Sequence, residues 1–233
     1  MKIPLNWLKD YVETTKSPRE IAMSFTQLGL MLDKPLDDTG VLDLEHRMDR
    51  SDWLSIMGCA RDFAAFENIK LKYPLSSTNK LSKVKPSEMV EITVNSPHVR
   101  RFNTRLVKNI KVAESPDWLK DRLTAYGIKS INNVVDITNY VMVEIGQPMH
   151  AQDTAKLIKR EITIRAAIKG EKIKTILGTT VSLDPDIFVL SSGGVGTVIG
   201  GIVGGIDTSV TKDTTEIILD AGNYDQSVIR KNS

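Results

Sequence analysis

The segment 130–153 limits the fold more than any other part of the chain, because it joins one amphipathic helix to a turn that no helix can continue through. Its apolar residues recur near helical spacing: Val134, Val135, Tyr140, Val141 and Ile145. Gly146 is a typical residue for ending a helix, and Pro148 prevents its continuation. The sequence therefore predicts a helix that ends at Gly146, followed by a turn that carries His150.

The polar residues of this predicted helix are unusual. They are short hydrogen-bonding side chains, which form helices poorly because they compete for backbone partners: Asn132, Asn133, Asp136, Thr138 and Asn139. A solvated helix face more often carries Glu, Lys and Arg. Two interpretations are open from spacing alone: a polar cluster held inside a pocket, or a core helix with a polar edge and a loop histidine.

Composition excludes several classes of site. The net charge of +2 over 233 residues forces no general polyanion-binding surface, so any RNA contact needs a local basic patch. The single cysteine, Cys59, excludes an intramolecular disulfide and a Cys-rich zinc site. The opening residues carry no signal-peptide pattern, and the longest weakly polar stretch, 195–206, is rich in glycine and too short for a bilayer. A cytoplasmic protein without a membrane segment is expected.

Helical and strand patterns divide the chain into two predicted parts. Residues 1–40 are expected to form a small helical N-terminal domain with a polar linker, in which Ser17 caps a helix that ends at Gly29. Residues 41–233 are expected to form a mixed sheet with helices, including a helix capped by Ser51 and Asp52 and another that ends at Gly127. The predicted fold class is α/β, of the α+β type.

A glycine-rich stretch at residues 193–205 suggests close backbone approach. It lacks the Lys-Ser/Thr of a P-loop and does not lead into a helix in the Gly-x-Gly-x-x-Gly context, so a nucleotide cradle is not favoured. A pocket wall built from bare backbone fits this pattern better.

A basic cluster lies beside an aromatic residue at Arg100, Arg101, Phe102 and Arg105. Such a cluster can bind a phosphate and stack a base. It can equally be a solvated strand end, and both readings stay open.

Several motifs carry a resemblance to one family. Residues 134–142 read Val-Val-Asp-Ile-Thr-Asn-Tyr-Val-Met, and residues 146–151 read Gly-Gln-Pro-Met-His-Ala. With the glycine pairs 200–201 and 204–205 and the run 214–224, they resemble the editing region of the bacterial-type phenylalanyl-tRNA synthetase beta subunit. The resemblance covers residues 4–230. Most bacterial relatives insert an oligonucleotide-binding-fold domain after about residue 40, and this sequence does not contain that insertion.

This resemblance implies an editing activity: hydrolysis of the aminoacyl ester of mischarged tyrosyl-tRNA(Phe). It places Thr138, Asn139 and His150 around the ester, as the catalytic group. It also implies that small residues admit the amino-acid ring and that one carboxylate meets the tyrosine phenol: Gly200, Gly201, Ala221 and, in place of the family's Glu, Asp220. Arg101 and Phe102 match an Arg-aromatic pair of the family, and with Arg100 they form the expected tRNA-binding group.

The expected hydrolysis depends on positioning, because the sequence offers no Ser-His-Asp arrangement and no metal-ligand cluster. Hydrogen bonds would orient a water and the terminal ribose. His150 serves as a base or binds the terminal adenosine, and both roles remain open. No cofactor is expected in this chain, since ATP and magnesium belong to the holoenzyme. The implied partners are tRNA(Phe) and the synthetase alpha subunit, in a heterotetramer of two alpha and two beta subunits.

A non-catalytic role is the main alternative. The chain would then be a scaffold that binds tRNA and the alpha subunit, with a degenerate pocket. Three departures from the family pattern favour this reading: Asp220 for Glu, Gln152 for Phe, and Ile206 for Glu. A small-molecule or phosphate-binding domain is a third, weaker reading.

Overall fold

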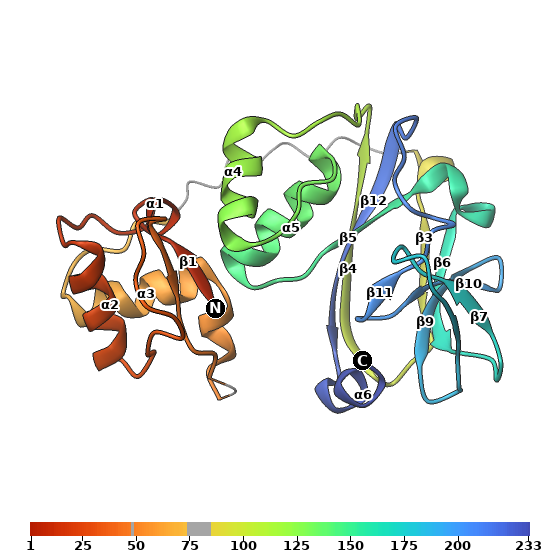
Figure 1. Cartoon of the computed structure of the whole chain (residues 1–233). Helices are drawn as coiled ribbons and strands as arrows, with labels where there is room; N and C mark the ends of the chain where they lie inside the picture. Colours follow the sequence, from red (N-terminus) through yellow and green to blue (C-terminus); the bar gives the residue numbers. More distant parts are fainter. Residues whose placement is uncertain (48, 74–84) are drawn as a thin grey trace. The chain divides into compact units, whose positions relative to one another are not determined.

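The structure is a computed structural model that describes residues 1–47, 49–73 and 85–233. The described residues form two compact units, each built from two stretches of chain (Figure 1). The first unit comes from Met1–Lys80 and Glu114–Pro148, and the second from Leu81–Ala113 and Met149–Ser233. Helices and mixed strands confirm the predicted α+β class. The domain boundary between residues 40 and 41 stays a prediction, and the compact units divide the chain elsewhere.

The first unit is mostly helical. Its elements are the two-stranded antiparallel pair β1 (Lys2–Pro4) and β2 (Val41–Asp43), and the helices α1 (Leu5–Leu8), α2 (Pro18–Gln27), α3 (Ile56–Phe66), α4 (Asp117–Tyr126) and α5 (Asn133–Ile145). The predicted cap of α2 is confirmed, because the Ser17 hydroxyl accepts from the Glu20 backbone N–H and the Glu20 carboxylate accepts from the Ser17 backbone N–H.

One hydrophobic core joins α5 to the N-terminal helices. The rings of Trp7 and Tyr140 stack with their centroids 4.6 Å apart, and the Tyr11 hydroxyl donates to the Glu144 carboxylate. Val143 is buried in the same cluster as Trp7. The helix α5 lies well after residue 41 in the sequence. These contacts are the physical reason why it belongs to the unit that also holds residues 1–40.

The cap predicted for α3 at Ser51 and Asp52 is wrong by one turn. Residues 51–54 form a separate 3₁₀ turn, and Ser55 is the N-cap, with its hydroxyl accepting from the Gly58 N–H at 3.0 Å. The Asp52 carboxylate instead accepts hydrogen bonds from Arg50. A charged partner nearby therefore outcompetes the backbone for this carboxylate.

The start of α5 uses two of the short polar side chains. The Asn132 side chain accepts from the N–H groups of Val134 and Val135, as an N-cap. Asp136 is fully buried and accepts from the hydroxyls of Ser115 and Ser130, each at 2.5 Å, and from the N–H of residue 131 at 2.8 Å. Both residues therefore shape the helix start. The predicted end at Gly146 is confirmed, with φ at 79°.

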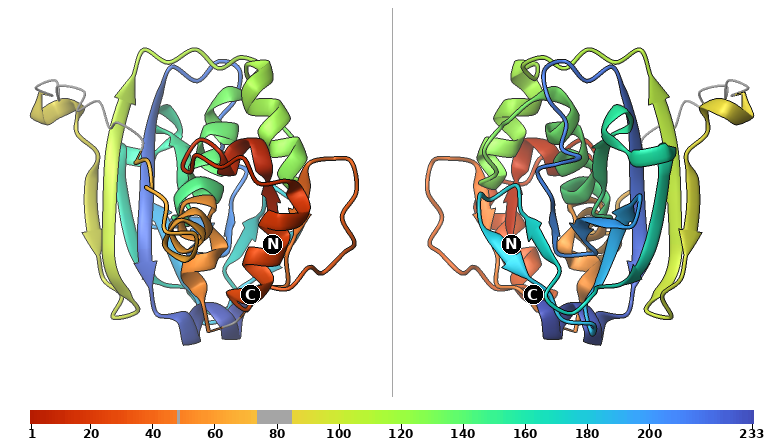
Figure 2. Two further views of the ribbon diagram at one scale, coloured as in Figure 1. Left: turned by 90° about the vertical axis from the view of Figure 1, so that its left-hand side faces the viewer. Right: turned by 90° about the vertical axis from the view of Figure 1, so that its right-hand side faces the viewer.

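The second unit contains two sheets. Five strands follow the order β11-β10-β9-β6-β3, with β3 and β6 parallel and the other neighbours antiparallel. Three antiparallel strands follow the order β4-β12-β5, and Figure 2 shows β4 and β12 side by side. The strands are β3 (Glu91–Val94), β4 (Val99–Lys108), β5 (His150–Asp153), β6 (Glu161–Ala166), β9 (Phe188–Ser192), β10 (Val195–Ile199), β11 (Val203–Gly204) and β12 (Glu216–Tyr224).

Smaller elements complete this unit. The strands β7 (Lys172–Lys174) and β8 (Thr180–Ser182) form an antiparallel hairpin, with Gly178 between them. The chain ends in α6 (Gln226–Asn232), capped by the Asp225 side chain. In the part of the chain that the structure describes, no helix has the length and apolar character needed to cross a membrane.

A hydrophobic cluster fills the space between the two sheets. From the five-stranded sheet it takes Ile164, Phe188 and Leu190, and from the three-stranded sheet it takes Ile218 with Phe102 and Tyr224 packed against it. One face of β12 therefore looks toward the five-stranded sheet. Because strand side chains alternate between faces, the residues at even positions from 218 to 224 share that face.

Candidate functional site

The register of the three-stranded sheet brings the candidate residues into one row. His150 on β5 lies opposite Asp220 on β12, and Thr104 on β4 lies opposite Asp220 on the other side. Gln152 lies opposite Ile218, one step along the same face of β5 as His150. His150, Gln152 and Asp220 therefore share the face that looks toward the five-stranded sheet.

Asp220 is a buried carboxyl group with one hydrogen-bond donor. Only 5% of the residue is exposed, and Gln152 Nε2 donates to its Oδ2 at 3.4 Å. Burial raises the pKa of Asp220 to about 7, and the hydrogen bond from Gln152 opposes that rise. At neutral pH the group is therefore present in both its protonated and its ionised form.

The imidazole of His150 packs against bare backbone. A β-carbon on Gly204 would lie 2.6 Å from Cε1 and 3.1 Å from Nε2 of His150, so no side chain fits at that glycine beside the ring. Burial lowers the pKa of His150, which keeps the ring neutral at neutral pH. A neutral ring can accept a proton or a hydrogen bond at one nitrogen.

Two atoms on this face are buried without a hydrogen-bond partner: His150 Nε2 and Gln152 Oε1. In the described part of the second unit the same is true only of Arg160 Nε and Thr208 Oγ1. Buried polar atoms in proteins nearly always have a partner. The unpaired nitrogen and oxygen on one face therefore mark a place suited to a water or to a polar group of a ligand.

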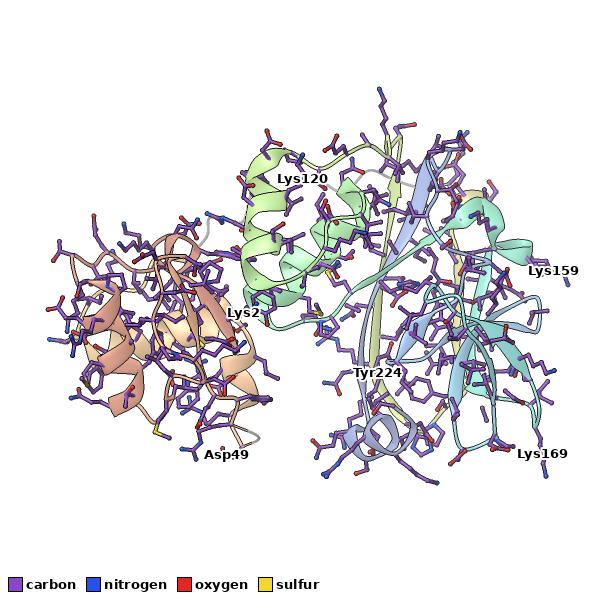
Figure 3. The ribbon with its side chains drawn as sticks, viewed as in Figure 1. Lys2, Asp49, Lys120, Lys159, Lys169 and Tyr224 are labelled. Atoms are coloured by element: carbon purple, nitrogen blue, oxygen red, sulfur yellow. The ribbon has the colours of Figure 1, made fainter. Side chains whose placement is uncertain are left out.

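The glycine turn between β10 and β11 packs on aromatic rings of the chain. A β-carbon on Gly200 would stand 2.1 Å from the Phe188 ring, and one on Gly201, whose φ is 70°, would stand 3.0 Å from the Tyr224 ring. The ring centroids of Phe188 and Tyr224 are themselves 5.1 Å apart. Tyr224, labelled in Figure 3, ends β12 on the same face as Asp220. The bare backbone here allows close packing of the turn on the sheet.

Alternation along β12 separates Ala221 from Asp220. Ala221 lies opposite Asn103 and belongs to the other face of the sheet. The small residue that shares the face of Asp220 is Gly222.

Thr138 and Asn139 belong to the first unit, and the remaining candidates belong to the second. Thr138 is buried, and its hydroxyl donates to the Val135 carbonyl at 2.7 Å. Within the second unit the structure brings His150 and Asp220 together on one face. A single cavity shared with Thr138 and Asn139 stays a prediction.

The expected tRNA-binding residues lie on β4, an edge strand of its sheet. Arg100 and Arg101 are exposed, whereas Phe102 is half-buried and packs on the core between the sheets. Arg100 has Asp225 4.0 Å away, and Arg101 Nε donates to Asn103 Oδ1 at 3.4 Å. Neighbouring residues on a strand point to opposite faces, so Arg101 and Phe102 do not lie side by side.

Sequence reasoning missed four residues at this site: Gln152, Gly222 and Tyr224 on the face itself, and Gly204 on β11, which packs against His150. Gln152 was read only as a departure from a family pattern, yet it is fully buried beside Asp220. The alternation of β5 carries a signal that finds it, because residues 150 and 152 share one face of a strand.

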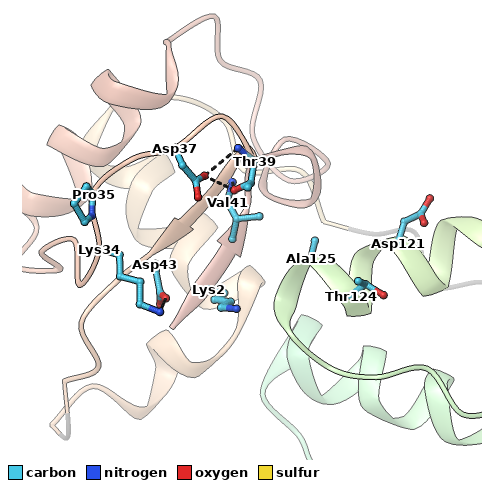
Figure 4. A pocket seen from close by; sticks show the side chains of 10 residues that line it. All are labelled: Lys2, Lys34, Pro35, Asp37, Thr39, Val41, Asp43, Asp121, Thr124 and Ala125. Carbon is cyan, nitrogen blue, oxygen red and sulfur yellow. Dashed lines mark hydrogen bonds and ion pairs between the residues drawn. The ribbon is translucent and has the colours of Figure 1, made fainter.

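A separate cavity of about 500 Å³ lies in the first unit beside β1, β2 and α4 (Figure 4). Three of its charged side chains have partners: Lys34 Nζ lies 3.4 Å from Asp43, and the Asp37 carboxylate accepts from the Thr39 N–H at 2.9 Å. Among the described residues, none of the buried unpartnered side-chain atoms belongs to its lining. The face around Asp220 is therefore the stronger candidate.

Comparison with known proteins gives consistent matches. Residues 98–233 match the family model of the B3/4 domain. The phenylalanine–tRNA ligase beta subunit of Clostridium tetani is 36% identical over 214 residues, which cover 91% of this chain and 27% of that protein. The beta subunit of Fusobacterium nucleatum is 40% identical over 194 residues, covering 83% of this chain and 24% of that protein. The chain spans about a quarter of the length of these relatives.

The beta subunit of Rhodopirellula baltica aligns over 234 residues at 33% identity, covering 99% of this chain and 34% of that protein. Among solved structures, an N-terminal fragment of the phenylalanyl-tRNA synthetase beta subunit from Pyrococcus horikoshii matches with a TM-score of 0.50. The match covers 98% of this chain and 69% of that chain at 15% identity, so it shows a likeness of fold alone. The resemblance drawn from the sequence motifs is confirmed.

Proposed function

Because this chain belongs to the B3/4 domain family, and its relatives are beta subunits of phenylalanine–tRNA ligase, we propose that it edits tRNA by hydrolysing the ester of tyrosyl-tRNA(Phe). One observation carries this proposal: a buried carboxyl group, Asp220, lies opposite a neutral histidine with an unpaired buried nitrogen. That pair offers a group to meet a phenol and a group to hold a water.

The chemistry of selection explains why such a site is useful. Tyrosine differs from phenylalanine by one hydroxyl group, and an apolar pocket rejects an added hydroxyl only modestly. A second site that hydrogen-bonds the hydroxyl group has the opposite preference, because phenylalanine would leave its polar groups unpaired. In this proposal Asp220 meets the phenol.

The proposed hydrolysis adds water across the ester bond. His150 takes a proton from the attacking water through Nε2, which is neutral and unpaired, and the water oxygen bonds to the ester carbonyl carbon. The bond from that carbon to the ribose oxygen then breaks, and the ribose oxygen receives the proton. Tyrosine and tRNA with a free terminal hydroxyl leave. Thr138 and Asn139 orient the ester and the terminal ribose, as positioning groups.

The proposed partners follow from the relatives. Arg100 and Arg101, exposed on β4, would contact tRNA(Phe) phosphates, with Phe102 fixing the strand from the core side. The beta chain would assemble with the alpha subunit as two alpha and two beta subunits in the cytoplasm. The editing reaction needs no cofactor from this chain, whereas aminoacylation by the holoenzyme would use ATP and magnesium.

A deacylation assay tests the proposal. The purified chain is incubated with tyrosyl-tRNA(Phe) and, as the matched substrate, phenylalanyl-tRNA(Phe), and the release of each amino acid is timed. We expect faster release of tyrosine than the uncatalysed rate, and a loss of that release in the double variant His150→Ala with Thr138→Ala. His46→Ala, which changes an exposed histidine of the first unit, is the control.

The outcomes separate editing from the scaffold role. Wild-type release at the uncatalysed rate would support a non-catalytic scaffold that binds tRNA and the alpha subunit. Unchanged release in the double variant would show that the residue assignment is wrong while the activity stands.

A further inference from the structure

Gln152 is a buried side chain whose hydrogen bonds are incomplete. The residue is fully buried on β5, its Nε2 donates to Asp220 Oδ2 at 3.4 Å, and its Oε1 has no partner. A primary amide offers two N–H donors and an acceptor oxygen with two lone pairs. The amide atom that has no partner at all is thus the oxygen, an acceptor, one step along β5 from His150.

We infer that Gln152 is a specificity-determining residue of the Asp220 face, whose Oε1 accepts the hydroxyl hydrogen of the tyrosyl ring while its Nε2 donates to the Asp220 carboxyl. The inference rests on the proposed editing function and goes beyond it, because it names the group that distinguishes tyrosine from phenylalanine. A phenylalanyl ring supplies no donor and leaves the buried oxygen unpaired, which is unfavourable.

The amide has a property that the carboxyl group lacks. Asp220 changes between its neutral and ionised forms close to neutral pH, so the hydrogen-bonding character of its oxygens changes with pH. The amide oxygen of Gln152 is an acceptor in every condition in which the chain is folded. A phenol therefore meets one constant acceptor, and Asp220 adds to it when ionised.

Few other titratable groups face Asp220. His150 on β5 and Tyr224 on β12 share its face of the sheet, and β4 places Thr104 opposite it. Residues 200–205, whose glycines pack against His150 and Tyr224, include no titratable side chain. Changes in the titration of Asp220 can thus be assigned to Gln152, His150 or Tyr224 by substitution.

Binding of small probes tests the inference without relying on catalysis. The affinity of the chain for tyrosinamide and for phenylalaninamide is measured by NMR titration. Gln152→Met, which keeps the length and removes the amide, is expected to weaken tyrosinamide binding roughly tenfold and to leave phenylalaninamide binding unchanged. The control is Thr208→Val, which removes a buried hydroxyl of the second unit that also has no partner. It is expected to bind both probes as the wild type does.

The pH profile supplies a readout that packing alone would not move. Because the hydrogen bond from Gln152 lowers the pKa of Asp220, its loss in Gln152→Met is expected to shift the pH dependence of tyrosinamide binding to higher pH. A variant that keeps both the wild-type preference for tyrosinamide and the wild-type pH profile would overturn the inference.

Two further outcomes are decisive. If Gln152→Met does not fold, Gln152→Glu replaces it, because that variant retains acceptor oxygens. Gln152→Glu is expected to keep the preference for tyrosinamide. Loss of that preference would contradict the role of the oxygen. If the wild type prefers tyrosinamide but hydrolyses no tyrosyl-tRNA(Phe), the editing function fails while the role of Gln152 is still judged by binding. A wild type that binds neither probe would overturn the role given to Gln152, while the deacylation assay still decides the editing function.

Discussion

The phenol of Tyr224 lies directly over Gly222, two residues earlier on the same face of β12. A β-carbon on Gly222 would stand 2.1 Å from the phenolic oxygen and 2.0 Å from Cζ. The Tyr224 ring also packs against the Phe188 ring and the bare backbone of Gly201. The absence of a side chain at Gly222 thus lets the Tyr224 ring lie back along the strand toward Asp220, and the charge of Asp220 adds to burial in raising the pKa of Tyr224.

This close approach predicts coupling between the two positions. Gly222→Ala forces the Tyr224 ring out of its place, and we expect it to lower the free energy of unfolding by about 1–3 kcal/mol. The same change made in a Tyr224→Ala background is expected to cost much less, because the ring is gone. Urea unfolding of the four proteins measures the coupling. Additive effects would contradict the packing described, and Asn223→Ala, exposed on the same strand, is expected to stay within about 0.5 kcal/mol of the wild type.

The contact between Gly204 and His150 predicts a change in the titration of the histidine. Gly204→Ala places a methyl group where the imidazole packs, so the ring is expected to move toward solvent. Its pKa, lowered by burial in the wild type, would then rise toward its ordinary value of about 6.5. NMR titration of the His150 ring protons measures this. A pKa equal to that of the wild type would mean that the ring tolerates the methyl group. Tyrosyl-tRNA(Phe) deacylation is expected to fall in parallel.

The raised pKa of Asp220 predicts how stability depends on pH. The carboxyl group ionises near pH 4 in the unfolded chain and near pH 7 in the folded one, so the folded state binds the proton more tightly. Its contribution to stability is therefore full below about pH 4 and declines as the pH rises through 7. Relative to the wild type, Asp220→Asn is expected to gain about 2–4 kcal/mol between pH 4 and pH 8.

Urea unfolding of both proteins at several pH values measures this difference. Because the Asn side chain changes hydrogen bonding equally at every pH, only the slope of the difference bears on the ionisation. A difference that stays constant from pH 4 to pH 8 would show that Asp220 has an ordinary pKa.

Asp136 predicts a large effect on the stability of the first unit. It is fully buried and accepts from Ser115, Ser130 and the N–H of residue 131, so Asp136→Ala leaves three donors unpaired. We expect a loss of about 2–4 kcal/mol in the free energy of unfolding. Asp121→Ala, at an exposed position of α4, is the matched control and is expected to change little. Similar losses in both variants would contradict the role given to the buried carboxylate.

Local sequence patterns predicted elements better than they predicted which residues meet. The end of α5 at Gly146 and the capping box of α2 follow from local backbone chemistry, and both are confirmed. The cap of α3 failed because Asp52 accepts from Arg50, a side-chain choice that spacing does not encode. Local rules work where the competing partners are only backbone groups.

Which residues meet on the Asp220 face depends on how β5 pairs with β12, and the sequence of neither strand alone specifies that pairing. Asp220 was predicted as a pocket residue, yet its neighbour Gln152 comes from a strand far away in the sequence. The family resemblance implies Ala221 as a small residue that admits the ring beside Asp220, although strand alternation sends the two residues to opposite faces. Pairing of distant strands therefore decides which of the candidate side chains can act together.

The division of the chain into interleaved units has a consequence for truncation. A fragment trimmed to residues 98–233, the span of the family match, would lack β3, the parallel neighbour of β6. It would also retain Tyr140 on α5 without the indole of Trp7 against which that ring stacks. An unprotected strand edge and a bare aromatic surface both promote aggregation, so such a fragment is a poor choice for expression.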